Sequence, residues 1–199
     1  MGIADTREEA CFTLLAELTS LDISLMHETV SLRWEPATAF FALASAWWVK
    51  GPLLIGMAGV GDAIRRRWLP VAALLTFLAF ELASLANHLL KVTFERPRPP
   101  IEDKTIDAVG KVPESFSFPS GHAMSAFAAA TAIAVMCPKL RWPALSIAAV
   151  VAMSRPYLGM HFWFDVVIGS VLGAAIGAAV GLVAVRKLPG LRAPQPQPA

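Results

Sequence analysis

Three groups of reactive or anion-binding residues lie at the borders of apolar segments, between residues 91 and 165. They are, in chain order, Lys91 with Arg98, then Pro119-Ser120-Gly121-His122, and then Ser154-Arg155 with His161 and Asp165. Cations, imidazoles, a hydroxyl and a carboxylate are rare beside apolar spans unless they serve a common function. If the three groups meet at one end of the fold, they predict a site for an anion.

The cations of these groups favour phosphate as that anion. Lys91, Arg98 and Arg155 provide three positive charges, and the planar guanidinium of arginine binds two phosphate oxygens at once. The backbone N–H groups of Ser120 and Gly121 would begin a helix and point at the anion, with the helix dipole behind them. We therefore expect these five residues to bind phosphate.

The histidines and the aspartate favour phosphoryl transfer. His161 and Asp165 are four residues apart on one helical face, so the carboxylate can accept from one imidazole nitrogen and leave the other as a nucleophile. His122 remains as the general acid, since an imidazole pKa of about 6.5 suits proton transfer near neutrality. Ser120 beside His122 is an alternative nucleophile. The nearby cations would repel a divalent ion, so we expect no metal and no cofactor.

Each group taken alone also fits a structural role. Lys91 and Arg98 could anchor a helix at the membrane interface. A proline and a serine before an apolar run, as at Pro119-Ser120, could simply cap a helix. The functional interpretation therefore depends on whether the three groups lie on the same side of a membrane.

The composition predicts a membrane protein. Of the 199 residues, 56% are hydrophobic and 16% are charged, whereas soluble domains are roughly a quarter charged. This excludes a disordered, collagen-like or coiled-coil chain, and a net charge of +2 does not favour a nucleic-acid partner. Five apolar segments of near membrane-spanning length follow one another at residues 37–61, 68–90, 119–137, 143–160 and 164–185. We expect an all-α, polytopic membrane helix bundle of about five transmembrane helices.

The distribution of basic residues predicts the orientation. Eight basic residues follow the first, third and fifth apolar segments, namely Arg65, Arg66, Arg67, Lys139, Arg141, Arg186, Lys187 and Arg192. The positive-inside rule places these connections and the C-terminus in the cytoplasm. The three reactive groups then share the outer, or periplasmic, face of the plasma (inner) membrane. The sequence makes no prediction of the oligomeric state.

Both ends of the chain differ from the apolar centre. Residues 1–35 hold seven acidic and two basic residues between regularly spaced leucines, which predicts an amphipathic helix at the membrane interface. Residues 189–199 are rich in proline and predict a disordered tail. Lys50 and Glu81 would lie at similar depth in neighbouring spans, either as a buried ion pair or with separate polar contacts.

Small residues predict how two of the spans pack. Glycines follow His161 and Asp165 at four-residue steps, at Gly169, Gly173, Gly177 and Gly181. Gly121, Ser125 and Ala129 form a similar row in the third apolar segment. Rows of small residues let membrane helices approach closely. We expect the third and fifth spans to pack together and to bring His122 near His161, although a generic glycine-rich helix would show the same spacing.

The spacing of the reactive residues resembles the signature of the type 2 phosphatidic acid phosphatase (PAP2) superfamily. The matching motifs are Lys91-(six residues)-Arg98-Pro99, Pro119-Ser120-Gly121-His122, and Ser154-Arg155-(five residues)-His161-(three residues)-Asp165. The resemblance implies a transmembrane phosphatase domain over residues 36–188 with its signature at 91–165. It also implies a metal-independent mechanism through a phosphohistidine on His161, with Asp165 orienting it and His122 as general acid.

The resemblance implies a lipid substrate in the bilayer. We expect hydrolysis of a lipid phosphate or diphosphate at the outer face, with undecaprenyl diphosphate as the first candidate and phosphatidic acid or phosphatidylglycerophosphate next. Two alternatives remain open. A phosphotransferase would pass the phosphoryl group from His161 to an alcohol, and a non-catalytic lipid-phosphate binding or transport protein would use the same cations without turnover.

Overall fold

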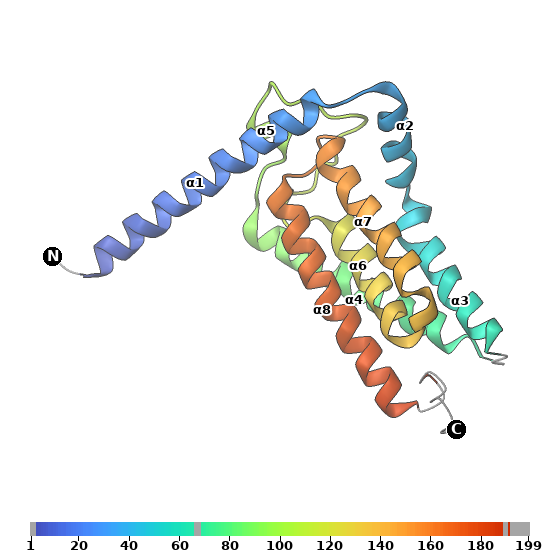
Figure 1. The fold of residues 1–199 in the computed structure, drawn as a ribbon. Helices are drawn as coiled ribbons and strands as arrows, with labels where there is room; N and C mark the ends of the chain where they lie inside the picture. The colour runs from blue at the N-terminus through green and yellow to red at the C-terminus, as the bar shows by residue number, and fades with distance from the viewer. Residues whose placement is uncertain (1–2, 66–68, 189–190, 192–199) are drawn as a thin grey trace, which may run out of the picture.

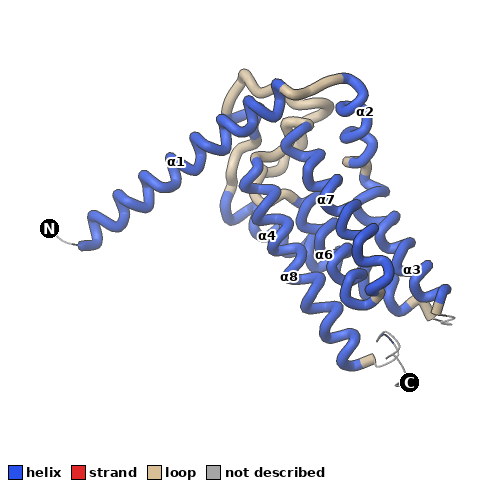
Figure 2. The backbone as a smooth tube through the Cα atoms, viewed as in Figure 1, coloured by secondary structure: helices blue, strands red, loops and turns tan. Residues whose placement is uncertain are grey.

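The computed structural model describes residues 3–65, 69–188 and 191, and within these residues the chain is helical and contains no strand (Figures 1 and 2). The α-helices are α1 (Ile3–Ser31), α2 (Glu35–Ala44), α3 (Leu54–Ile64), α4 (Val71–Phe94), α5 (Pro99–Glu102), α6 (Gly121–Met136), α7 (Arg141–Tyr157) and α8 (Trp163–Lys187). A π-helical turn, Val49–Leu53, leads into α3, and a 3-10 turn, Pro138–Leu140, leads into α7. The expected all-α class is confirmed for the described residues.

Several of the described helices could cross a membrane. The segments Val71–Glu102 and Trp163–Lys187 are long and apolar enough by themselves. The pair Glu35–Ala44 and Val49–Ile64 meets the same test together, with a bend of 63° between its halves, and Gly121–Met136 is a shorter apolar helix. These segments form a polytopic bundle, and the number of five crossings stays a prediction.

The first apolar segment is broken rather than continuous. Pro52 lies inside the π-helical turn and has no N–H to donate to the preceding turn, which bends the helix. A Cβ on Gly51 would lie 3.0 Å from the ring of Phe80 on α4, so the missing side chain lets the two helices meet there.

The expected ion pair between Lys50 and Glu81 is wrong for the structure. Among the described residues no ion pair joins them: Glu81 is exposed, while Lys50 lines a cavity with His122 and Arg155. The physical reason is the rotation of about 100° between neighbouring helical residues. Because Phe80 packs on Gly51, Glu81 points away from the first span.

α6 lies at the centre of the bundle and packs against α4, α7 and α8. Its contact with α8 depends on glycine: a Cβ on Gly169 would lie 2.8 Å from the carbonyl oxygen of Ser120. A Cβ on Gly173 or Gly177 would overlap the carbonyl of Met124 or Ala128. The predicted packing of the third and fifth spans along the glycine row is confirmed.

α1 extends away from the bundle and contacts it only near its C-terminal end (Figure 1). Met26 is fully buried there, and Trp163 donates its indole N–H to Thr29 Oγ1 at 2.8 Å. Leu21 and Leu25 are exposed. The helix predicted for residues 1–35 is present, and its place at the membrane interface stays a prediction. The predicted tail, 189–199, lies outside the described residues except for Leu191.

Replacing Gly173 by alanine should separate α6 from α8. The new Cβ cannot fit against the backbone of Met124, so we expect the free energy of unfolding to fall by about 1–3 kcal/mol, as for other overpacked positions. Thermal unfolding in detergent measures this change. Gly56→Ala is the matched control, because a Cβ there has no heavy atom within 4 Å. Equal melting temperatures for the two variants would contradict the packing role of Gly173.

Candidate active site

A cavity of about 330 Å³ lies where α4, α6 and α7 meet the connections near α5 and before α8. Six of the eight residues singled out in the sequence line it: Lys91, Arg98, Gly121, His122, Arg155 and His161. The other two adjoin it, since the backbone N–H of Ser120 donates to the carbonyl oxygen of Asp165 at 3.0 Å. The fold therefore brings the three sequence groups together at one end of the bundle.

His161 lies in the connection between α7 and α8 and is buried. Its Nε2 is 3.3 Å from Nη1 of Arg98, and its Nδ1 is 3.4 Å from Oγ of Ser117. Because a guanidinium only donates hydrogen bonds, this contact assigns the lone pair to Nε2 and the proton to Nδ1. Burial lowers the pKa of His161 to about 3, although the nearby carboxylate of Asp165 opposes that shift. The imidazole is therefore neutral near pH 7.

Asp165 lies in the first turn of α8 and has no exposed surface. Its Oδ1 accepts from Arg96 Nη1 at 2.6 Å, and its Oδ2 accepts from Ser117 Oγ at 2.5 Å and from Phe162 N at 3.1 Å. Its Oδ2 is 3.6 Å from Nδ1 of His161, which is longer than a hydrogen bond. Ser117 is within reach of both partners, so its hydroxyl can accept from His161 and donate to Asp165.

Arg96 connects the site to α1. Its Nη2 donates to Oδ2 of Asp22 at 2.8 Å, and its guanidinium lies 4.1 Å above the ring of Phe162. Asp22 is only 4% exposed, and its other oxygen accepts from the backbone N–H of Phe164 at 3.2 Å. An acidic residue of the N-terminal helix is therefore part of the network around Asp165.

The sequence offered Arg96 only as an accessory contact and did not point to Ser117 or Asp22. Arg96 has the second Arg-Pro pair, but only Arg98 has the family spacing from Lys91. Ser117 lies three residues before Ser120 in a serine-containing loop, and Asp22 is one of several acids in an amphipathic pattern. No periodicity or spacing distinguishes them, because their partners are distant in the chain.

Two of the expected phosphate-binding cations are held by carbonyl oxygens of the connections between α5 and α6 and between α7 and α8. Arg98 donates from Nε to the carbonyl of Ser115 at 2.7 Å and from Nη1 to the carbonyl of Met160 at 2.8 Å. Lys91, in the last turn of α4, donates to the carbonyl of Phe116. These contacts fix the positions of both cations beside His161, because carbonyl oxygens neutralise no charge and leave the cations available to an anion.

Two buried polar atoms in the site have no protein partner. They are Nε of Arg155 and Oγ of Ser120, whose residues are 6% and 0% exposed. Ser120 is the N-cap of α6, yet its side chain makes no capping hydrogen bond, which removes the simple helix-cap explanation of this serine. Buried polar groups are nearly always paired in native structures. These two atoms therefore indicate a polar ligand between α6 and α7.

Gly121 also packs against α4, a contact that the sequence did not predict. A Cβ at this position would lie 2.8 Å from Oδ1 of Asn87, whose Nδ2 donates to the carbonyl of Pro119 at 2.9 Å. The glycine thus lets α4 approach the start of α6. Among the described residues no group of three His, Cys, Asp or Glu side chains could hold a metal ion.

Comparisons with known proteins agree with this architecture. The model of the PAP2 superfamily matches residues 70–188. Phosphatidylglycerophosphatase B of Bacillus subtilis is 35% identical over 133 residues, 61% of this chain and 61% of that protein, which is less than two thirds of its length. Decaprenylphosphoryl-5-phosphoribose phosphatase of Mycolicibacterium smegmatis is 38% identical over 158 residues, which cover 77% of this chain and 79% of that protein.

A solved structure shares the fold as well. The crystal structure of a transmembrane PAP2-type phosphatidylglycerolphosphate phosphatase from Bacillus subtilis superimposes with a TM-score of 0.68 and 29% sequence identity. The superposition covers 86% of this chain and 88% of the other. The family match spans more than half of the chain and contains all three motifs that line the cavity. The chain therefore belongs to the PAP2 superfamily.

Proposed function

We propose that this protein is a metal-independent lipid phosphatase that works through a phosphohistidine on His161. The observation that carries the proposal is the state of this side chain: it is buried and neutral, with Nε2 beside Arg98 and the proton on the side of Ser117 and Asp165. Such an imidazole has its lone pair on the nitrogen that lies among the phosphate-binding cations. That arrangement suits nucleophilic attack on phosphorus.

Two displacements complete the reaction. Nε2 of His161 attacks the phosphorus, the bond from phosphorus to the lipid oxygen breaks, and His122 gives that oxygen a proton. A water molecule then gives a proton to His122, attacks the phosphohistidine and releases inorganic phosphate. Lys91, Arg98 and Arg155 stabilise the charge on the transferred phosphoryl oxygens, the main contribution expected of a protein in phosphoryl transfer.

Asp165 supports the first displacement by stabilising the positive charge that develops on the imidazole. It can do so only while it stays ionised in a site with no exposed surface, and Arg96 provides the charged partner. Ser117 completes the connection between the imidazole and the carboxylate. In this proposal Arg96 and Ser117 are positioning residues, because neither is assigned to the substrate.

The proposed substrate is a lipid with a phosphate or diphosphate head group. Undecaprenyl diphosphate is the first candidate, followed by phosphatidylglycerophosphate and phosphatidic acid. The names of the two relatives support a phosphorylated lipid, since one denotes a phosphatidylglycerophosphatase and the other a phosphatase of a decaprenyl-linked phosphoribose. Both of those substrates have a second phosphate nearer to the lipid than the one released.

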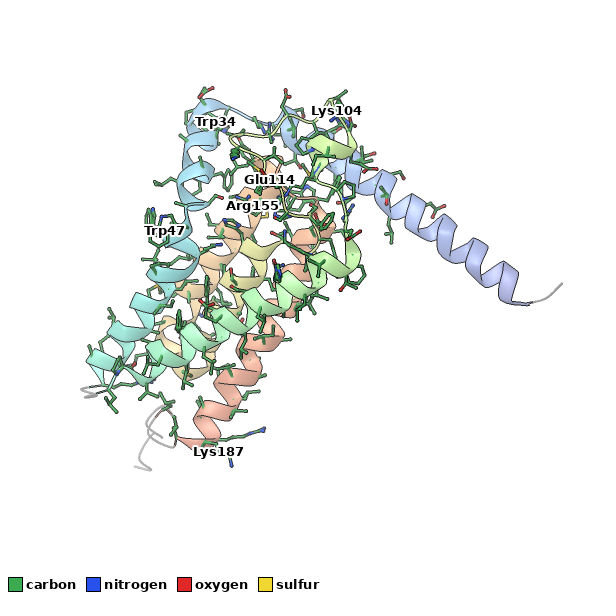
Figure 3. All side chains as sticks on the ribbon, turned by 180° about the vertical axis from the view of Figure 1, so that it is seen from behind. Trp34, Trp47, Lys104, Glu114, Arg155 and Lys187 are labelled. Carbon is green, nitrogen blue, oxygen red and sulfur yellow. The ribbon has the colours of Figure 1, made fainter. Side chains whose placement is uncertain are left out.

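The proposed topology is a chain that crosses the plasma membrane five times with the cavity on the outer side and the C-terminus in the cytoplasm. Arg155 lies toward the end of the bundle that carries Lys104, and Lys187 lies at the opposite end (Figure 3). The described basic residues at this end support the orientation by the positive-inside rule: Arg65 after α3, Lys139 and Arg141 after α6, and Arg186 and Lys187 in the last turn of α8. Arg66, Arg67 and Arg192, which also entered the sequence argument, lie outside the described residues.

Removal of the nucleophile should abolish activity, and a chelator should not affect it. With excess chelator, the detergent-solubilised wild type should release phosphate from at least one of the three lipids, and His161→Ala should be slower by at least about a thousandfold. His27→Ala is the matched control, since His27 contacts Asp103 on the surface. Loss of wild-type activity in chelator would contradict the metal-free mechanism.

The same assay separates the alternatives. Acid-labile, alkali-stable phosphate on the wild type supports the phosphohistidine, and full activity of His161→Ala would exclude it. A phosphotransferase would give a phosphorylated alcohol when an alcohol acceptor is added, with little free phosphate. A binding or transport protein would bind the lipids without turnover.

Loss of the Arg96 charge should impair catalysis more than substrate binding. In Arg96→Gln, Asp165 loses its charged partner, so we expect kcat to fall at least about tenfold with little change in KM, because small misplacements of reacting groups are costly. Arg96→Lys should recover part of the rate. The double variant Arg96→Gln/Asp22→Asn should unfold at a higher temperature than Arg96→Gln, but its kcat should stay as low. Recovery of both would indicate that Arg96 has only a structural role.

Cysteine labelling in intact cells tests the proposed topology. Lys104 and Lys187 are exposed at opposite ends of the bundle (Figure 3). In a background with Cys11 and Cys137 replaced by alanine, Lys104→Cys should react with a membrane-impermeant maleimide, whereas Lys187→Cys should react only after lysis. The reverse pattern would place the cavity on the cytoplasmic side.

A further inference from the structure

The break in the first apolar segment forms a wall of the cavity. Oγ of Ser45, at the C-terminal end of α2, accepts a hydrogen bond from Nη1 of Arg155. The backbone of Ser45 forms a hydrogen bond with the imidazole of His122. Lys50, in the π-helical turn, lines the cavity itself. This wall precedes residues 70–188, so the family match does not include it. π-helical turns often occur at functional sites.

Lys50 contributes a charge that no carboxylate of the described residues balances. Its charged neighbours are cations instead, since it lies close enough to Arg155 and Lys91 to interact with both electrostatically. A lysine side chain held among like charges in an apolar bundle is unfavourable unless an anion joins them.

The number of cations in the cavity exceeds what one phosphate requires. Four of them line it, namely Lys50, Lys91, Arg98 and Arg155, and none of its lining residues is a carboxylate. A terminal phosphate carries a charge of about −1.5 to −2 at pH 7. The three cations of the family signature already balance that charge. The fourth therefore favours a ligand with a second anionic group.

The shape of the cavity indicates where this second group would lie. From Lys91 the lining follows α4 through Asn87 to Ser84, seven residues and about 10 Å toward the membrane interior. It also continues along α6 from His122 to Ser125. The Ser84 and Ser125 hydroxyls donate to carbonyls of their own helices, at 2.9 and 2.7 Å. Lys50 follows Ser45, the partner of Arg155, by five residues along the first span, and it is the charged lining residue that we place on this inner side.

We propose that Lys50 binds the lipid-proximal phosphate of a substrate that has two phosphate groups. A lipid enters from the bilayer, so its terminal phosphate reaches His161 while the phosphate attached to the lipid lies on the inner side, where Lys50 is. This proposal rests on the proposed function and adds a determinant of specificity. Lys50 distinguishes two-phosphate lipids from lipids with a single phosphomonoester.

A pair of substrates with the same acyl chains tests the proposal. Diacylglycerol diphosphate and phosphatidic acid differ only in the second phosphate. We expect Lys50→Met to lower kcat/KM at least tenfold for diacylglycerol diphosphate and less than threefold for phosphatidic acid. Lys50→Arg, which keeps the charge, should retain the preference. Lys104→Met, which removes an exposed lysine of the outer loop, should leave both values unchanged.

Soluble inhibitors separate the head group from the lipid. In Lys50→Met, the inhibition constant of inorganic diphosphate should rise at least tenfold, and that of orthophosphate should stay within threefold. Equal losses with both lipids, or no loss with either, would contradict the proposal while the proposed phosphatase function stands. Absence of wild-type turnover would instead contradict the proposed function. If Lys50→Met and Lys50→Gln both fail to fold while Lys50→Arg folds, Lys50 has a structural role and the proposal is wrong.

Discussion

A carboxylate that has no exposed surface must be compensated by its neighbours, and the arrangement around Asp165 follows from this requirement. Arg96 supplies the opposite charge, and Ser117 and the Phe162 N–H supply further donors. These partners come from the loop between α4 and α6 and from the turn before α8. The loop is therefore held against the bundle by the group that also faces His161. The contacts that stabilise the buried charge are also those that, in our proposal, orient the imidazole.

Close packing of α6 on α8 makes this arrangement possible. The carbonyl of Asp165 accepts from the backbone of Ser120, and Gly169 sits against the same serine. A larger residue at Gly169 or Gly173 would push α6 and α8 apart. The first turns of these helices hold His122 and Asp165. In our proposal the glycine row has a catalytic consequence as well as a structural one, since helix separation sets the distance between the segments that hold His122 and His161.

The two elements that precede the family match both reach the site. α1 contributes Asp22, which binds the far side of Arg96, and the broken first span contributes Ser45 and Lys50. The signature residues are therefore enclosed by parts of the chain that the signature does not describe. In our proposals the signature residues act on the reacting phosphate. α1 and the broken first span act on stability, positioning and the choice of substrate.

The sequence alone determined the class of fold, the family and the group of residues that line the cavity, because apolar length and motif spacing are local properties of the chain. It also predicted the α6–α8 contact from the row of glycines, although a generic glycine-rich helix would show the same spacing. Only the tertiary structure decided that Lys50 faces the cavity instead of Glu81, and that Asp22, Arg96 and Ser117 surround Asp165. How the helices pack decides the direction of a side chain after a bend. It also decides the partner of a buried charge, which here lies 69 or 74 residues away in the chain. No spacing pattern in the sequence indicates the side-chain direction or the distant partner.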